Sequence, residues 1–428
     1  MKDVLLINLS SYPEFSVGTV FPIGLNKIKS YLMDRGYECM IYDYHKEPIL
    51  DINDILGLDF RFIGIGIRNL DTLELDSKLQ YKKYINFINE FYRIKIEKGL
   101  ESSIVIGGAG YSLYYEKFNK LIQYDFGISG NGEHAFLQLL QGNTESKNII
   151  SSASCQERII YDEELVRAYL KANTDLSIGV QTYEGKCPKQ CIYCCYNYKD
   201  VEFTTKKVTD VVIEIEQLLS LNVKCIFIVD QVFNITDDYA IYILKHIKEK
   251  INFMRFMAFL NPSLNEELYL LIKDCGLFPI YSFDSFSTPI LSSLKKDFTV
   301  EEIRETIKIC RQYEIPFSSS LILGAIGENE NTIKETCTFI NKYFLEKSEL
   351  SISFGIRIVP KSRLFDLTID ETKDYLKPIF LYFSPDIFDY FYKYINKRLI
   401  NTERFLKHCH YKNAYYLQEY VQLIEKKG

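Results

Sequence analysis

The stretch CPKQCIYC spans residues 187–194 and places Cys187, Cys191 and Cys194 in a C-x3-C-x2-C spacing, with Tyr193 before the last cysteine. Three thiolates on one short loop cannot complete a four-coordinate zinc site without a fourth ligand, such as Cys195 or a distant histidine. An iron–sulfur cube held by three thiolates instead leaves one iron open for a substrate or cosubstrate. The spacing therefore points to an iron–sulfur centre, with structural zinc as the alternative.

Strand-like and helix-like segments alternate around this loop, from about residue 177 to residue 365. A capping box of Thr299 and Glu302 predicts the start of one of the helices. This alternation predicts a partial (β/α)6 barrel, in which chemistry takes place at the C-terminal ends of the strands. The cysteine loop follows the first strand, and that position favours a catalytic cluster over structural zinc. The predicted strands are Ile178–Thr182, Lys224–Val229, Met254–Phe259, Pro279–Phe283, Phe317–Leu323 and Ile352–Ile358.

Residues 1–145 alternate with a shorter period and predict an N-terminal doubly wound parallel sheet of the α/β class. Ligands of such sheets bind outside the carboxyl ends of the strands. Most of these ends are rich in glycine or small polar residues, which would let a large flat ligand approach the backbone. Alternatively, the glycines only make tight turns. The apolar runs are Val4–Asn8, Cys39–Asp43, Phe62–Ile67, Ser103–Gly108 and Phe126–Gly130.

The remaining segments and the composition complete the domain plan. Residues 146–176 are polar and irregular and predict a linker, and residues 366–428 predict a C-terminal helical region. The chain has 428 residues, 47% of them hydrophobic, and a net charge of −6, which argues against a basic nucleic-acid surface. We find no long apolar run and no secretory signal, so we expect a cytoplasmic protein without a membrane span. The odd number of cysteines, eleven, argues against a disulfide framework.

The motif of Cys187, Cys191, Tyr193 and Cys194 resembles the signature of the radical S-adenosylmethionine (SAM) enzymes. The resemblance implies that the three cysteines bind a [4Fe–4S] cluster whose open iron chelates SAM. It also implies that one electron cleaves SAM to a 5′-deoxyadenosyl radical, which abstracts hydrogen from the substrate.

Further segments are similar to the cobalamin-dependent subgroup of this family, and together they cover residues 1–365. One departure is Lys186, which separates Gly185 from Cys187, and another is Asn131, which replaces a more usual acidic residue. No second cysteine cluster follows residue 195. The similar segments are GVQT at 179–182, FIVDQVFN at 227–234, FDS at 283–285, GAIGE at 324–328, GIRIVP at 355–360, IRNLD at 67–71, GGAGYS at 107–112 and GNGE at 130–133.

The resemblance also implies site residues. SAM would contact Tyr193, Asp230, Gln231, Asp284, Ser285, Gly324, Gly327 and Arg357. Cobalamin would contact Ser10, Arg68, Asn69, Asp71, Gly107, Gly108, Ala109, Gly110, Gly130, Gly132 and Glu133. The Asp230 carboxylate suits the SAM ammonium through a charge-assisted hydrogen bond.

Several of these residues have plainer alternatives. Asp230 could cap the next helix, Asp284 could form an inter-strand ion pair, and Arg357 could point outward. His45 comes close to a D-x-H-x-x-G cobalt-ligand pattern, but Pro48 replaces the glycine, so we predict an exposed turn residue that does not bind cobalt.

The resemblance implies a C-methyltransferase that methylates an unactivated carbon through a 5′-deoxyadenosyl radical and methylcobalamin. The first alternative is a cobalamin-binding radical SAM enzyme that catalyses a rearrangement, cyclisation or oxidation without methyl transfer. The second is a non-catalytic cobalamin- or metal-binding regulator. Expected partners are a small-molecule or peptide substrate and an electron donor such as flavodoxin or ferredoxin, with no nucleic acid and no membrane.

Overall fold

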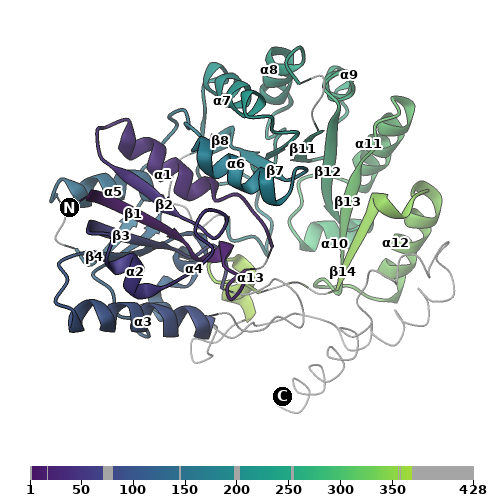
Figure 1. Ribbon diagram of the computed structural model, residues 1–428. Coiled ribbons are helices and arrows are strands. Elements are labelled where there is room, and N and C mark those ends of the chain that lie inside the picture. The colour runs from purple at the N-terminus through teal and green to yellow at the C-terminus, as the bar shows by residue number, and fades with distance from the viewer. Residues whose placement is uncertain are drawn as a thin grey trace. The chain divides into compact units, whose positions relative to one another are not determined.

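The computed structural model describes residues 2–16, 18–70, 81–143, 146–196, 203–251, 255–354, 356 and 358–368 (Figure 1). The described residues form two compact units. The first holds the residues up to 186 together with 203–227, and the second holds 187–196 together with 228–368. None of the described helices is long and apolar enough to cross a membrane.

The first unit is built on a six-stranded sheet with the order β2-β1-β3-β4-β5-β6, and all of its neighbouring strands are parallel. This confirms the predicted doubly wound parallel sheet. The sixth strand lies within the segment predicted as a linker. It was not predicted, because its four residues include two exposed positions and give no clear strand pattern. The strands are β1 (Lys2–Asn8), β2 (Cys39–Tyr42), β3 (Phe60–Gly66), β4 (Ser103–Gly107), β5 (Phe126–Gly130) and β6 (Asn148–Ser151).

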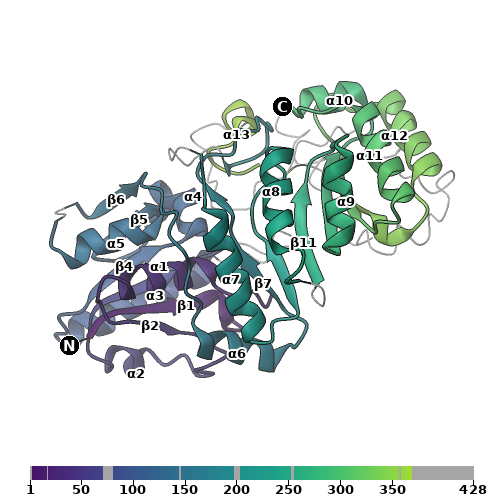
Figure 2. The same ribbon diagram turned by 90° about the horizontal axis from the view of Figure 1, so that it is seen from above.

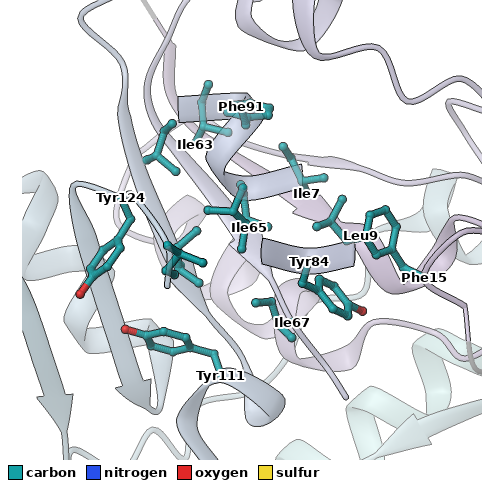
Figure 3. Packing of buried hydrophobic residues seen from close by; sticks show 14 of the residues in the cluster. Ile7, Leu9, Phe15, Ile63, Ile65, Ile67, Tyr84, Phe91, Tyr111 and Tyr124 are labelled. Carbon is teal, nitrogen blue, oxygen red and sulfur yellow. The ribbon is translucent and has the colours of Figure 1, made fainter. Parts of the chain in front are cut away.

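Helices cover both faces of this sheet, which is why its central strands are almost continuously apolar. On one face, a Cβ at Gly64 would touch Phe136 and a Cβ at Gly66 would touch Leu25, so α5 and α1 pack closely there. On the other face, Tyr84 and Phe91 of α3 pack in one core with the isoleucines of β1 and β3 (Figure 3). The helices are α1 (Ile23–Met33), α2 (Ile52–Leu56), α3 (Tyr81–Glu97), α4 (Ala109–Phe118), α5 (Gly132–Leu140) and α6 (Glu163–Ala172).

The second sheet has the strand order β14-β13-β12-β11-β10-β7 and agrees with the predicted strand–helix alternation. The pairings of β11 with β12, β12 with β13 and β13 with β14 are parallel. The strands are β7 (Ser177–Val180), β10 (Cys225–Ile228), β11 (Arg255–Leu260), β12 (Leu277–Asp284), β13 (Ser318–Leu323) and β14 (Leu350–Phe354).

The helices of the second unit that follow β10 to β13 lie side by side on one face of the strands (Figures 1 and 2). The predicted capping box is confirmed, because Thr299 and Glu302 satisfy each other's backbone N–H groups at the start of α11. The helices are α8 (Asp237–Ile247), α9 (Glu266–Asp274), α10 (Thr288–Ser293), α11 (Val300–Gln312), α12 (Glu330–Tyr343) and α13 (Arg363–Thr368), while α7 (Val208–Ser220) belongs to the first unit.

Two short paired strands flank the cysteine loop, one before it in the chain and one after it. Strand β8 (Tyr183–Glu184) pairs antiparallel with β9 (Thr204–Thr205), and the Lys206 N–H donates to the Thr182 carbonyl. Glu184 is buried and pairs with Lys27 of α1, which also lies 3.2 Å from Glu133. The base of the loop is therefore fixed within the first unit by buried charges.

Candidate functional site

The cysteine loop carries free thiols in a largely enclosed setting. Cys187 is buried, and Cys191, Cys194 and Cys195 are partly buried. Burial raises the pKa of Cys187 and Cys191, and raises that of Cys194 to about 12. Cys187 and Cys191 are near enough to raise the pKa of Cys194 further, so the thiols are neighbours. They keep their protons at neutral pH, and metal binding would have to displace those protons.

The donor set, three free thiols on one loop, fits an iron–sulfur cluster. Within the described ranges, no three His, Cys, Asp or Glu side chains are placed to hold one metal ion. A zinc site needs its ligands to converge on a single ion, whereas a [4Fe–4S] cube takes each thiolate on a different iron. The three free thiols of this loop supply one ligand to each of three irons of such a cube.

The loop is fixed to other parts of the second unit by its backbone and by one ion pair. The Ile192 N–H donates to the Leu294 carbonyl at 3.1 Å, and the Ile192 carbonyl accepts from the Leu364 N–H at 2.8 Å. Lys189 forms an ion pair with Asp297. The turn at 294–297, after α10, and the start of α13 thus hold the loop in place.

Tyr193 extends from this loop to the end of β12. Its hydroxyl donates to Oδ2 of Asp284, which also accepts from Lys296 Nζ at 2.6 Å. Asp284 has a φ of 64°, and the register of β12 against β13 shifts next to it. Burial, and then the charge of Asp284, raise the pKa of Tyr193 well above its ordinary value, so the phenol remains a donor.

Asp284 therefore has an ion pair, but not the inter-strand pair of its plainer alternative, because its partner Lys296 follows α10 and lies on no strand. Ser320 also lies 3.4 Å from Oδ1 of Asp284. Lys296 follows α10 and stands beside Lys295, and nothing in the sequence distinguishes the two lysines. The structure does, because the side chain of Lys296 is only 5% exposed.

Three other predicted SAM contacts lie where strands end. Asp230 and Ser285 are buried and Gln231 is half-buried, just after β10 or β12. The alternative that Asp230 caps the next helix is wrong, since Thr236 is the N-cap of α8 and accepts from the Tyr239 N–H. Asp230 is therefore a buried carboxylate at a strand end without a role as the N-cap of α8.

Gly324 and Gly327 form the turn after β13, with φ values of 92° and 82°. Oε2 of Glu328 accepts from the N–H groups of Gly324 and Ala325. Its other oxygen has no hydrogen-bond partner among the described residues. Burial raises the pKa of Glu328 to about 7, although the two backbone N–H groups oppose the rise.

We expect Glu328→Gln to remove a pH dependence of stability. The folded-state pKa exceeds the ordinary value, so the folded chain keeps a proton that the unfolded chain releases, and wild-type stability falls from about pH 5 to about pH 7. Wild type should lose up to about 3 kcal/mol more than Glu328→Gln over this range. Urea unfolding at several pH values measures the difference. Glu330→Gln, at an exposed glutamate, is the control, and equal slopes for wild type and Glu328→Gln would contradict the prediction.

The predicted cobalamin residues follow neighbouring strands of the first sheet. Ser10 follows β1, Arg68 and Asn69 follow β3, the segment 107–110 ends β4 and begins α4, and 130–133 ends β5 and begins α5. Because the strand order is β1-β3-β4-β5, these segments share one carboxyl edge. Asp71 lies outside the described residues, as does Arg357 on the SAM side.

Some glycines at this edge are required by the packing of the chain itself. A Cβ at Gly108 would lie 2.4 Å from the Ile67 carbonyl oxygen, and one at Gly130 would lie 2.3 Å from that of Ser151. Gly107 differs, since its nearest neighbour would be 3.6 Å away. The turn alternative therefore explains Gly108 and Gly130 but does not explain Gly107.

His45 lies in a turn, as predicted, but it is half-buried, so the prediction that it is exposed is wrong. The centroid of its ring lies 4.1 Å from that of the Tyr169 ring, and its backbone N–H donates to the Asp43 carboxylate. Tyr169 belongs to α6, a helix within the predicted linker, and this unforeseen contact explains the error. The Tyr169 hydroxyl in turn donates to Asp43 at 2.9 Å.

Comparison with known proteins agrees with this geometry. The family model described as the radical SAM superfamily matches residues 183–340, which include the cysteine loop. The radical SAM methyltransferase TsrM from Kitasatospora setae, solved with cobalamin and a [4Fe–4S] cluster, superposes with a TM-score of 0.70 at 18% identity, over 85% of this chain and 74% of that one. Residues 183–340 therefore match a radical SAM domain, and the chain has the fold of the cobalamin-dependent type.

Other similar proteins extend the comparison. The cobalamin-dependent enzyme OxsB, solved with aqua-cobalamin, gives a TM-score of 0.66 at 15% identity, over 87% of this chain and 56% of that one. A curated tRNA-2-methylthio-N(6)-dimethylallyladenosine synthase from Wolbachia pipientis subsp. Culex pipiens is 24% identical over 332 residues, 73% of each chain. The enzyme of that name from Thermoanaerobacter pseudethanolicus is 23% identical over 341 residues, 74% of this chain and 70% of that one.

Proposed function

We propose that the chain is a cobalamin-dependent radical SAM C-methyltransferase that methylates an unactivated carbon. The observation that carries the proposal is the fold shared with the methyltransferase TsrM over 85% of this chain, combined with three free thiols on one loop in the matched region. When bound, a [4Fe–4S] cluster with SAM supplies a 5′-deoxyadenosyl radical, and cobalamin supplies the methyl group.

In this proposal, residues of the second unit hold the cluster and SAM. Cys187, Cys191 and Cys194 bind the cluster, and the buried Asp230 carboxylate accepts from the SAM ammonium. Burial at the strand ends keeps water away from a reactive radical. Tyr193, Gln231, Asp284, Ser285, Gly324, Gly327 and Arg357 complete the proposed SAM site.

Residues at the carboxyl edge of the first sheet hold cobalamin in this proposal. Gly107 supports it, because the chain's own packing does not require a glycine at this position. Glu133 would support this edge of the sheet without contacting cobalamin, since its carboxylate is buried and pairs with Lys27. The proposed contacts are Ser10, Arg68, Asn69, Asp71, Gly107, Gly108, Ala109, Gly110, Gly130 and Gly132.

We further propose a small-molecule substrate and a one-electron donor such as flavodoxin or ferredoxin. TsrM has been solved with tryptophan as its substrate, which supports a small molecule. The curated relatives are named for tRNA modification, but a net charge of −6 does not favour an RNA partner here. The second candidate remains a radical rearrangement, cyclisation or oxidation on the same fold.

The fate of SAM distinguishes these candidates without knowledge of the substrate. We would incubate the reconstituted chain with SAM and titanium(III) citrate, with and without hydroxocobalamin, and quantify both SAM products by mass spectrometry. A methyltransferase should release S-adenosylhomocysteine only when cobalamin is present, and 5′-deoxyadenosine in both cases. 5′-Deoxyadenosine alone would favour the second candidate, and neither product would favour a non-catalytic regulator.

A further inference from the structure

Lys296 is a buried cation next to the proposed cluster loop. Its side chain is 5% exposed and that of Asp284 is 3% exposed, and their charged atoms lie 2.6 Å apart. Lys296 Nζ also lies 3.4 Å from the Tyr193 hydroxyl and 5.2 Å from the centroid of the Phe298 ring. The ammonium is thus enclosed by one carboxylate, one phenol and an aromatic face.

Such an arrangement has a desolvation cost that lowers the stability of the fold. Burying an ion pair costs several kcal/mol in desolvation for each ion, and a pair of apolar residues would often be as stable. Loop attachment does not require the pair, because backbone hydrogen bonds and the Lys189–Asp297 pair already hold the loop. The fixed positive charge at this position therefore needs an explanation other than loop attachment.

The charge reaches the proposed cluster ligands. Tyr193, which Lys296 contacts, is two residues from Cys191 and adjacent to Cys194. The Asp284 carboxylate, 2.6 Å from Lys296 Nζ, pairs with the ammonium and fixes it in this position.

We infer that Lys296 and Asp284 are positioning residues whose opposite charges set the reduction potential of the cluster held by Cys187, Cys191 and Cys194. This inference rests on the proposed function, because it requires a cluster on these cysteines. In the step concerned, an external low-potential donor loses one electron, the [4Fe–4S]²⁺ cluster gains it and becomes [4Fe–4S]⁺, and no bond is made or broken. A nearby cation favours the added negative charge and a nearby anion opposes it.

Variants of the two residues should separate charge from structure. Lys296→Met removes a positive charge and should make the midpoint potential more negative, while Asp284→Asn removes a negative charge and should make it more positive. The double variant Lys296→Met/Asp284→Asn should lie close to wild type, as should Lys296→Arg. The measurement is a redox titration of the reconstituted cluster in each variant, followed by EPR of the reduced form and normalised to bound iron.

The outcomes distinguish this inference from the proposed function. Potentials ordered by charge, with Asp284→Asn above wild type, would support it even if Lys296→Met bound too little iron to titrate. Equal potentials, or Asp284→Asn and Lys296→Met shifted in the same direction, would overturn it and leave the proposed function intact. If reconstituted wild type formed no four-iron cluster, the proposed function itself would fail and this inference would fall with it.

Discussion

Cys187→Ala, Cys191→Ala and Cys194→Ala are each expected to abolish reductive SAM cleavage, whereas Cys195→Ala is expected to retain it. The first three side chains are the proposed cluster ligands, and a cube that loses one of three protein thiolates lacks a stable attachment. Cys195 is a partly buried free thiol on the same loop, so it controls for the loss of a thiol as such. The measurement is 5′-deoxyadenosine formed under anaerobic reducing conditions, alongside bound iron.

Two results would contradict this account of the loop. Wild-type cleavage in any of the first three variants would remove the basis for the radical SAM assignment of that cysteine. Loss of iron in Cys195→Ala as well would indicate that Cys195 is a further ligand, and zinc in place of iron in the wild type would indicate the four-thiolate zinc alternative. Metal analysis for iron and zinc separates these cases.

Lys27→Met is expected to destabilise the chain by about 3–5 kcal/mol, since it leaves buried carboxylates without their cation. Lys27 lies within reach of both Glu133 and Glu184, and all three residues are buried. Glu184 lies just before the cysteine loop and also accepts a hydrogen bond from the Cys155 N–H at 2.8 Å. Lys27 therefore neutralises a carboxylate that links this segment to Cys155. Equilibrium unfolding in urea, followed by circular dichroism, measures the loss.

The matched control for this prediction is Lys245→Met. Lys245 pairs with Glu267, but both side chains are more than half exposed, so we expect a change of about 0–1 kcal/mol. Comparable losses in the two variants would show that burial of the Lys27 network contributes nothing specific. A Lys27→Met variant as stable as wild type would contradict the prediction outright.

Much of the fold could be predicted because its signals are local. Runs such as Val4–Asn8 and Phe126–Gly130 are long enough to identify buried parallel strands, and Thr299 with Glu302 identified a helix start. The cysteine spacing identified the loop at a strand end for the same reason. The position of each motif relative to its strand follows from chain order alone.

The contacts that shape the site could not be predicted, because they join distant parts of the chain. Lys296 reaches Asp284 and Tyr193 only after β12 and α10 fold, and its neighbour Lys295 looks the same in sequence. His45 was misjudged because its partner Tyr169 lies more than a hundred residues away, on a helix that was not predicted. Glu328 belongs to the segment GAIGE, which was singled out by its similarity to the family. Only the folded turn shows that the Glu328 carboxylate accepts hydrogen bonds from two backbone N–H groups.

The proposed function requires one chain to hold both an iron–sulfur cluster and cobalamin, and cofactor stoichiometry tests this requirement. The chain would be reconstituted anaerobically with iron and sulfide, loaded with hydroxocobalamin, freed of excess, and analysed for iron, cobalt and EPR. We predict about four irons and about one cobalamin per chain. We also predict a cob(II)alamin signal without nitrogen splitting, because His45 is held against Tyr169. Four irons without retained cobalamin, or cobalamin without iron, would contradict the account.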